Sequence, residues 1–240
     1  MTAAERLRMK LDLAFPALRA SSERIWSSPL IGDLYPEYLA TMHAIVRSAT
    51  PLLLAASERA RELAGDDEVA AGLADYLAHH AEEERGHDEW LLEDLEALGG
   101  RLDEPLRRIP SPRVATFVGA QYYWLRHHHP VALLGHMAVV EGYPPQPGFA
   151  ERLRAATGYP ASAFRALRRH ERLDIRHRRE LYETIDALPL TPAHEAMIGV
   201  SALHTLQAAI AVLDEIHAVG ALGAGAGNKG GRNGRSISAA

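Results

Sequence analysis

Strong helix formers fill this sequence almost from end to end, and that feature restricts its possible folds more than any other. Ala, Leu, Arg and Glu dominate every segment up to about residue 219. Segments in which β-branched or aromatic residues alternate with polar ones are missing, so the sequence contains nothing from which to build a sheet. We therefore expect an all-α protein, folded as a single-domain helical bundle.

Prolines, glycines and capping residues divide the sequence into about seven predicted helices. They run over about 3–22, from 33 through 54, and over 67–98, 113–128, 130–141, 162–188 and 192–219. Pro51 is expected to kink the second helix, and Gly99-Gly100 to end the third. The folded domain is thus predicted to be 1–219, and the Gly-rich segment 220–240 a disordered tail.

Composition excludes several classes of protein. The chain has no cysteine, which excludes disulfides, thiolate zinc sites, iron–sulfur clusters and cysteine nucleophiles. A formal net charge of −5 argues against nucleic acid as a partner. We recognise no signal peptide and no uninterrupted apolar run long enough to span a membrane. A cytoplasmic protein without a membrane partner is therefore expected.

Two of the predicted helices carry spacings typical of metal ligands. In the third helix, Glu84 and His87 lie three residues apart and share one face. In the sixth helix, His170, Asp174 and His177 form a single stripe with the spacing i, i+4, i+7. On each helix, a carboxylate and an imidazole can therefore converge on one ion.

A further candidate, Glu141, ends the largely apolar fifth helix, where an unpaired carboxylate is costly to bury. Six nitrogen and oxygen donors without a thiolate suit iron or manganese, and a carboxylate can bridge two ions. Each signal alone has an ordinary explanation. Glu82–Glu84 can form a charged surface, and His170–His177 a salt-bridged face among arginines. Their occurrence together, on three separate helices, favours a metal site.

In this order the six residues resemble the pattern of the heme-oxygenase-like diiron oxidases, also called iron-containing redox enzymes. That family has Glu-x-x-His, a lone Glu, and His-x-x-x-Asp-x-x-His, which here are Glu84, His87, Glu141, His170, Asp174 and His177. The segments HAEEERGHDEWLLEDLEALG and ALLGHMAVVEG are similar to the family's third-helix and fifth-helix signatures. The resemblance spans about 33–219.

The resemblance implies a heme-oxygenase-like fold in which the six side chains hold two iron ions, with manganese as an alternative. It further implies that the ferrous protein reacts with O2 and oxidises a small organic metabolite. Chemistries known in the family are alkene formation from fatty acids, oxidative cleavage of amino acids and N-oxygenation. The expected partners are O2 and the small-molecule substrate, and a homodimer is a family-level expectation.

Other proteins of similar fold fit the sequence less well. Thiaminase-type relatives use a cysteine nucleophile, which this chain lacks. Heme oxygenases need a proximal histidine on the first helix, whereas no histidine precedes His43 here. A ferritin-like bundle usually shows two Glu-x-x-His pairs and two further Glu residues. A cofactorless oxidase of the same fold and a non-catalytic metal-binding helical protein stay open as alternatives.

The remaining histidines are assigned by their neighbours. His80 lies four residues before Glu84 on the same face. It could be a seventh ligand, but we favour a contact to the ligands or to the substrate. The run His127–His129 sits at a helix end and is expected to be a solvated junction. Three further histidines are expected in the core or lining a pocket: His43, His136 and His204.

Overall fold

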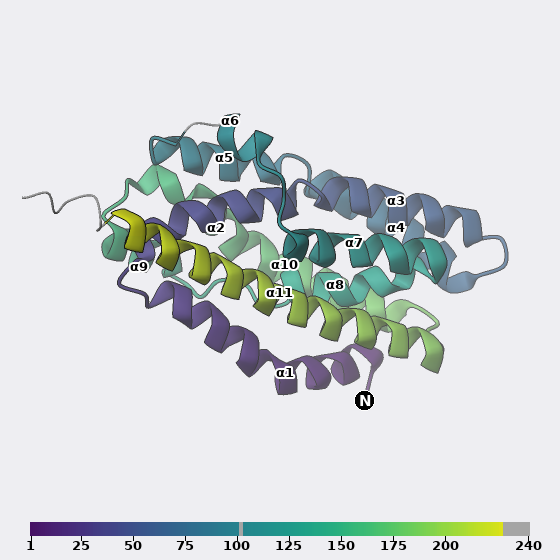
Figure 1. Cartoon of the computed structure of the whole chain (residues 1–240). Helices are drawn as coiled ribbons and strands as arrows, with labels where there is room; N and C mark the ends of the chain where they lie inside the picture. Colours follow the sequence, from purple (N-terminus) through teal and green to yellow (C-terminus); the bar gives the residue numbers. More distant parts are fainter. Residues whose placement is uncertain (101–102, 228–240) are drawn as a thin grey trace, which may run out of the picture.

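The computed structural model describes residues 1–100 and 103–227, and this part of the chain is helical without a strand (Figure 1). The α-helices in it are α1 (Ala3–Trp26), α2 (Ile31–Val46), α3 (Ala49–Leu63), α4 (Glu68–Glu83), α5 (His87–Ala97), α6 (Asp103–Arg107), α7 (Pro112–His127), α8 (Leu133–Val140), α9 (Phe149–Thr157), α10 (Arg165–Ala187) and α11 (Pro192–Gly227). Two short 3-10 helices, η1 (Pro130–Ala132) and η2 (Ala161–Phe164), lead into α8 and α10. The all-α prediction is confirmed.

The predicted helices are present, but two of them are each divided into two. The second is interrupted at 47–48 and is not kinked at Pro51. Pro51 lies in the first turn of α3, where a backbone N–H has no partner within the helix, so a proline costs no hydrogen bond there. The third is interrupted at 84–86, next to the predicted ligands. The short helices α6 and α9 fall in segments for which no helix was predicted.

The last helix extends further than expected. It ends at Gly227 rather than near Val219, so part of the predicted tail is helical. The rest of the predicted tail, residues 228–240, lies outside the described residues.

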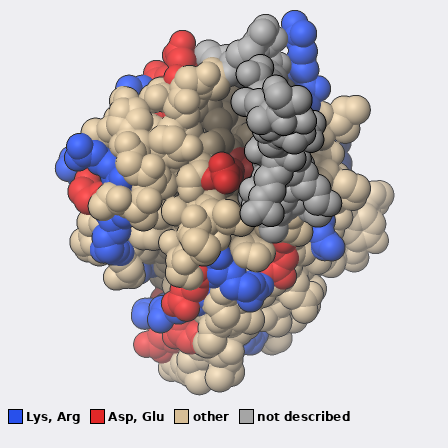
Figure 2. Space-filling model, turned by 60° about the vertical axis from the view of Figure 1, so that its left-hand side comes forward, with Lys and Arg blue, Asp and Glu red and all other residues tan. Residues whose placement is uncertain are grey.

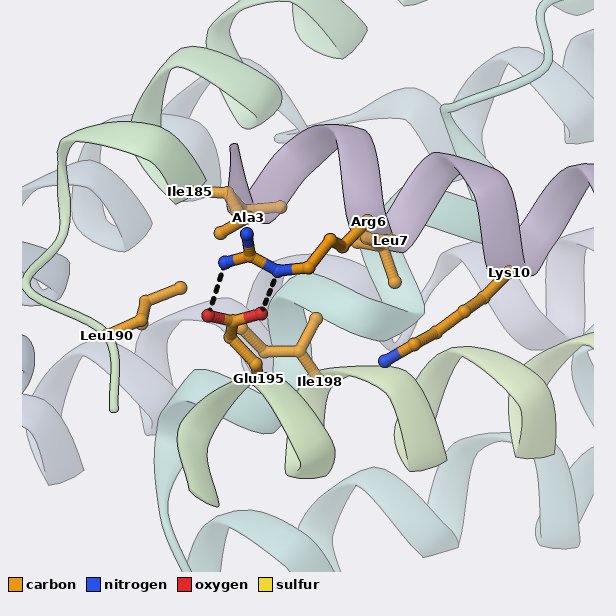
Figure 3. A pocket seen from close by; sticks show the side chains of 8 residues that line it. All are labelled: Ala3, Arg6, Leu7, Lys10, Ile185, Leu190, Glu195 and Ile198. Carbon is orange, nitrogen blue, oxygen red and sulfur yellow. Dashed lines mark hydrogen bonds and ion pairs between the residues drawn. The ribbon is translucent and has the colours of Figure 1, made fainter. Parts of the chain in front are cut away.

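The long helices α1 and α11 lie side by side along the bundle (Figure 1). A bidentate ion pair joins them, because Arg6 Nε and Nη2 lie 2.7 and 2.5 Å from the two carboxylate oxygens of Glu195 (Figure 3). On another side, α11 packs closely against α8 at Gly135. A Cβ atom at Gly135 would lie 2.1 Å from the carbonyl oxygen of Ile198, so only glycine permits this approach.

The interior contains two apolar clusters, one at each end of the bundle. The first includes Leu73 and Leu77 of α4 together with residues of α1, α3 and α8. The second includes Leu91 and Leu95 of α5 together with residues of α2, α9 and η2. The interruption between α4 and α5 lies at the junction of the two clusters, and the candidate site is built there.

A buried carboxylate fixes the start of α10, the helix with three predicted ligands. Asp94 of α5 is fully buried, and its two oxygens accept the backbone N–H groups of Arg165 and Ala166 at 2.9 and 3.0 Å. These N–H groups belong to the first turn of α10 and have no partner within the helix. Burial raises the pKa of Asp94 to about 6, although both hydrogen bonds oppose the shift.

Two helical stretches, 31–63 and 192–219, are long and apolar enough to cross a membrane by composition. The expectation from sequence considered only uninterrupted apolar runs and did not include them. The first stretch comprises two helices, and α11 packs against α1, α7 and α8. Helices in the interior of a bundle have the same composition, so these stretches are weak indicators of a membrane span.

One end of the molecular surface is seen in Figure 2, where acidic and basic side chains lie next to one another on a largely uncharged face. This face therefore carries both signs of charge rather than one extended basic or acidic patch.

Candidate metal centre

The interruption between α4 and α5 arranges the first group of site residues. Glu84 follows the last residue of α4, Gly86 takes the left-handed conformation with φ of 81°, and α5 begins at His87. The prediction that Glu84 and His87 share one continuous helix is therefore corrected. Their side chains still meet, with His87 Nδ1 3.1 Å from Glu84 Oε2.

Glu141 enters the site from the end of α8. Its side chain is buried, with the residue 9% exposed, and its Oε1 lies 3.2 Å from His80 Nε2. The other oxygen, Oε2, lies 3.8 Å from His177 Nδ1. The chain turns directly after it at Gly142, where a Cβ atom would lie 2.0 Å from the carbonyl oxygen of Ala138. The sharp turn at this glycine ends the helix with Glu141 directed inward.

The third group comes from α10, where His170, Asp174 and His177 follow one face as predicted. The His170 Nδ1 atom lies 2.9 Å from the carbonyl oxygen of Ala166, which can accept its hydrogen and leave Nε2 free to bind an ion. The His170 ring is 5.2 Å from the His87 ring, centroid to centroid. His177 Nδ1 lies 3.6 Å from Glu84 Oε1. These contacts connect α10 with Glu84 and His87, and the 3.8 Å approach of His177 to Glu141 connects it with the end of α8.

Many buried polar atoms in this cluster lack a hydrogen bond to any described residue. Among the six predicted ligands they are His87 Nδ1, Glu141 Oε2, Asp174 Oδ1 and His177 Nδ1. Leaving such atoms unpaired is costly in a protein interior, where nearly all buried polar groups find a partner. A cation that accepts lone pairs from nitrogen and oxygen would satisfy all four, so the donor set fits a metal centre.

The electrostatics of the cluster indicate the same need for positive charge. Burial, together with the carboxylates of Glu141 and Glu84, raises the pKa of Asp174 to about 8. Burial also raises the pKa of Glu141. Burial and the neighbouring His80 lower the pKa of His177 to about 4, so its imidazole is neutral at physiological pH and retains a lone pair for an ion.

Residues beyond the six also face the cluster, among them His80 and Glu83. His80 contacts Glu141, and its ring is 4.7 Å from the ring of His177. The Oε2 atom of Glu83 lies 3.8 Å from His80 Nδ1 and 3.7 Å from His177 Nε2. The Oε1 atom of Glu83 forms an ion pair with Arg176 Nη2 at 2.5 Å. The prediction considered Glu83 only as part of a charged run. Its spacing of three residues from His80 would have placed it on the same face.

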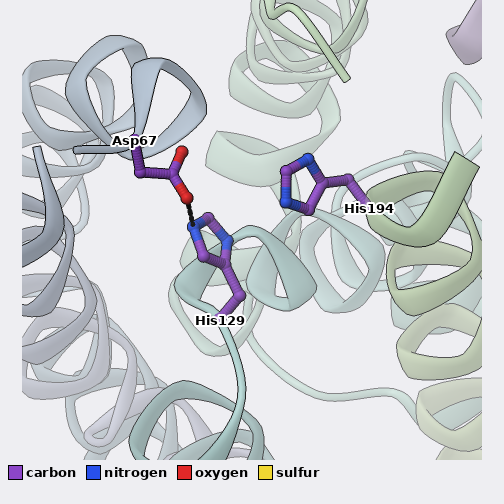
Figure 4. Close-up of side chains that lie close together, drawn as sticks. All are labelled: Asp67, His129 and His194. Atoms are coloured by element: carbon purple, nitrogen blue, oxygen red, sulfur yellow. Dashed lines mark ion pairs between the residues drawn. The ribbon is translucent and has the colours of Figure 1, made fainter. Parts of the chain in front are cut away.

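A second group of potential ligands, Asp67, His129 and His194, lies at the starts of α4, η1 and α11 (Figure 4). The Nδ1 atoms of both imidazoles accept backbone N–H groups, from Val131 at 3.1 Å and from Thr191 at 3.4 Å. A neutral imidazole that accepts at Nδ1 carries its hydrogen on Nε2 and has no lone pair there for a metal. We therefore interpret this group as a polar contact between helix starts.

Part of the histidine run 127–129 differs from the expectation. His127 and His128 are exposed as predicted, but His129 is only 8% exposed. It is buried because it caps η1 and faces Asp67, with His129 Nε2 3.2 Å from Asp67 Oδ2. His43 is buried in the core, and His136 contacts the Thr205 hydroxyl, in agreement with the prediction for these residues.

Comparisons with known proteins show the fold and the family of this chain. Solved structures with similar folds include a domain of unknown function with a heme oxygenase-like fold from Shewanella denitrificans. It is 16% identical with a TM-score of 0.73, and the match covers 97% of this chain and 96% of that one. A CADD-like protein of unknown function from Nostoc punctiforme is 15% identical with a TM-score of 0.69, covering 91% and 96%. A TenA homolog from Pseudomonas syringae is 11% identical with a TM-score of 0.61, covering 86% and 92%.

At these identities the structural matches show the heme oxygenase-like fold and nothing further. A search of curated proteins gives no match. The model of the iron-containing redox enzyme family, however, matches residues 37–210, a span that includes all six predicted ligands. The chain therefore belongs to the iron-containing redox enzyme family.

Proposed function

We propose that this protein is a non-heme diiron oxidase or oxygenase that uses O2 to oxidise a small organic metabolite. Glu84, His87, Glu141, His170, Asp174 and His177 would hold two iron ions, with manganese as an alternative at either position. The substrate class extends to fatty acids, amino acids and amines, and the reaction to decarboxylation, carbon–carbon cleavage or N-oxygenation. A cytoplasmic location and a homodimer are parts of the same proposal.

The observation that carries this proposal is the convergence of unpaired buried ligand atoms from α5, α8 and α10. Membership of an iron-containing family supports iron as the ion. When bound, iron supplies the redox chemistry that activates O2, which no side chain of this cysteine-free chain provides on its own. Six protein donors for two ions leave open positions for O2 and substrate.

The protein's own side chains position these ligands. His80 is placed to donate a hydrogen from Nε2 to Glu141 Oε1, which leaves Glu141 Oε2 for an ion. The carbonyl of Ala166 orients His170 through Nδ1. The surrounding apolar residues of both core clusters exclude bulk water and so strengthen every electrostatic interaction in the site.

The metal assignment is tested by anaerobic titration with Fe(II), followed by measurement of bound iron per chain. The parent should bind two ions, and Glu141→Ala or His170→Ala should bind clearly fewer. Glu82→Ala is the matched control, because Glu82 neighbours the site in sequence but is exposed and paired with Arg85. Undiminished binding by both site variants would refute the ligand assignment.

The enzymatic part of the proposal is tested by O2 uptake. The iron-loaded protein should consume O2, and candidate fatty acids, amino acids and amines should accelerate uptake with formation of an oxidised product. A protein that binds two Fe(II) ions but reacts with O2 under none of these conditions would instead be a non-catalytic metal-binding member of the fold. O2 consumption that persists in the metal-free protein would favour a cofactorless oxidase.

A further inference from the structure

Trp90 connects the surface of the molecule with two of the predicted metal ligands. Its indole ring is 4.0 Å from the His87 ring and 5.8 Å from the His170 ring, centroid to centroid. The guanidinium carbon of Arg169 lies 4.3 Å from the centroid of the same indole. Arg169 is exposed, Trp90 is half-buried and His87 is buried, so the three side chains form a continuous stack from solvent inward.

This stack arises from the spacing of the residues on two helices. Trp90 follows His87 by three residues on α5, which places both on one face. Arg169 directly precedes His170 on α10, so its guanidinium reaches the indole from the neighbouring helix. A guanidinium over an aromatic face is attracted to the ring and disfavours loss of an electron from it. The indole is therefore suited to conduct electrons inward without itself being oxidised.

Arg169 also belongs to a row of arginines along α10. Arg165, Arg169, Arg172 and Arg176 are spaced by four, three and four residues and share one face. Arg165 pairs with Glu93 and Arg176 with Glu83. Among the side chains that the structure describes, no carboxylate lies within ion-pairing distance of Arg169 or Arg172. This arginine row is locally basic in a chain whose formal net charge is −5.

We propose that Trp90 is the route by which electrons enter the metal centre, and that the arginine row of α10 docks an acidic electron-donor protein. This inference rests on the proposed diiron function. This row of twelve helical positions extends over about 16 Å, a length that matches a protein surface better than a small reductant. In each transfer the donor loses one electron and one ferric ion becomes ferrous. Two transfers restore a diferrous pair, and no bond of Trp90 forms or breaks.

The experiment measures how fast the iron-loaded, oxidised protein is reduced, by stopped-flow absorbance without O2. The probe is a reduced plant-type [2Fe–2S] ferredoxin, an acidic one-electron donor. With the parent, the second-order rate constant should fall as salt rises. Arg169→Gln with Arg172→Gln should lower it about tenfold at low salt and match the parent at high salt. Arg61→Gln, an exposed arginine of α3 that lies 3.9 Å from Asp75 and outside the row, is the control for charge.

The indole is tested with Trp90→Phe and Trp90→Tyr, which keep an aromatic ring at this position. At saturating ferredoxin both variants should be reduced several-fold more slowly than the parent while retaining its salt dependence. Trp26→Phe is the control, because Trp26 packs against Tyr38 and Phe149 rather than against a predicted ligand. An independent readout is indole fluorescence. Co(II) binding should quench the parent and the Trp26→Phe variant, and should have little effect on Trp90→Phe.

The outcomes separate this inference from the function on which it rests. Reduction of Trp90→Phe and Trp90→Tyr at the parent's rate, with iron content unchanged, would overturn the electron route alone. Equal rates for the parent and the double arginine variant at low salt would overturn the docking surface. A parent that takes up no iron would overturn the proposed function, and this inference with it.

Discussion

Four carboxylates meet in the buried cluster, and at the scale of single residues their charges decide what the site can hold. Among the side chains that the structure describes, an arginine, Arg176, directly contacts Glu83 alone of the four. Glu84 lies against His87, whose imidazole lowers the pKa of Glu84 although burial opposes the shift. Glu141 and Asp174 both have raised pKa values because of burial. Burial thus disfavours the charged form of both carboxylates, and a bound cation would favour it.

The first prediction concerns Glu83, which lies beside the outer nitrogens of His80 and His177. We expect its carboxylate to orient His177 toward the ions and His80 toward Glu141. Glu83→Gln should therefore weaken Co(II) or Fe(II) binding about tenfold or more while two ions still bind. Titration calorimetry under anaerobic conditions measures both quantities. Glu82→Gln should bind as the parent does. A stoichiometry of one ion in Glu83→Gln would mean that Glu83 is itself a ligand.

The residue spacing predicts the stripe of His170, Asp174 and His177, because positions three and four apart on a helix share a face. Glu84 and His87 meet although the helix is interrupted at Gly86, and Glu141 was identified by its place at the end of an apolar helix. Two residues escape the same reasoning. Glu83 was concealed in a run of three glutamates, and the burial of His129 depends on Asp67, which is 62 residues away in the chain. Contacts across such distances leave no periodic signal in a single sequence.

At the scale of elements, the predicted segments are helical in the structure, but the predicted helix boundaries are less accurate. The interruption at Gly86 was missed because the residues around it are strong helix formers, and the left-handed glycine acts through packing rather than propensity. The anchoring of α10 by Asp94 was also missed, since the carboxylate and the N–H groups that it caps are about 70 residues apart. Both features position site residues.

The second prediction tests that anchor. Asp94→Ala would leave the N–H groups of Arg165 and Ala166 buried or poorly hydrated at the start of α10. We expect a loss of about 2–3 kcal/mol in the free energy of unfolding, measured by urea denaturation of the metal-free protein. Asp94→Asn keeps one acceptor oxygen and should lose clearly less. If Asp94→Ala unfolds at the same urea concentration as the parent, the carboxylate does not stabilise α10.

The third prediction concerns pH and the contact between the starts of α4, η1 and α11. Burial lowers the pKa of His129, an effect opposed by Asp67 and reinforced by His194 and Arg59. A lowered pKa means that the folded state prefers the neutral imidazole. The contribution of His129 to the free energy of unfolding is therefore complete above the unfolded-state pKa of about 6.5. It is lost as the pH falls through the lower pKa of the folded state.

We accordingly expect the free energy of unfolding to decrease between pH 7 and pH 5 less steeply in His129→Asn than in the parent. Asparagine retains a side-chain oxygen for the N–H of Val131 but does not titrate. The exposed His127→Asn should follow the parent, which controls for all other titrating groups. Identical pH profiles for His129→Asn and the parent would contradict the role assigned to this contact.

At the scale of the whole molecule, the bundle encloses the site between two apolar clusters, and the helices α1, α7, α10 and α11 contribute residues to both. The close approach of α8 and α11 at Gly135 holds the helix of Glu141, and the Asp94 anchor holds the helix with His170, Asp174 and His177. Because the ligands come from separate elements, ion binding would connect α5, α8 and α10 directly. The stability of the entire fold should therefore depend on the metal.

The last prediction follows from this dependence. A ligand that binds only the folded state adds about 2.7 kcal/mol at one hundred times its dissociation constant. For a chain of this size that corresponds to a rise of about 5–10 °C in the melting temperature. Fe(II), Mn(II) or Co(II) should each produce such a rise in the parent, measured by anaerobic differential scanning calorimetry. Mg²⁺ should produce little rise in the melting temperature, because it prefers oxygen ligands and retains its waters.

The variants show whether the rise comes from the proposed site. Glu141→Ala should lose most of the rise, whereas Glu82→Ala should keep it. An equal rise in Glu141→Ala would mean that the ions stabilise the bundle at some other place.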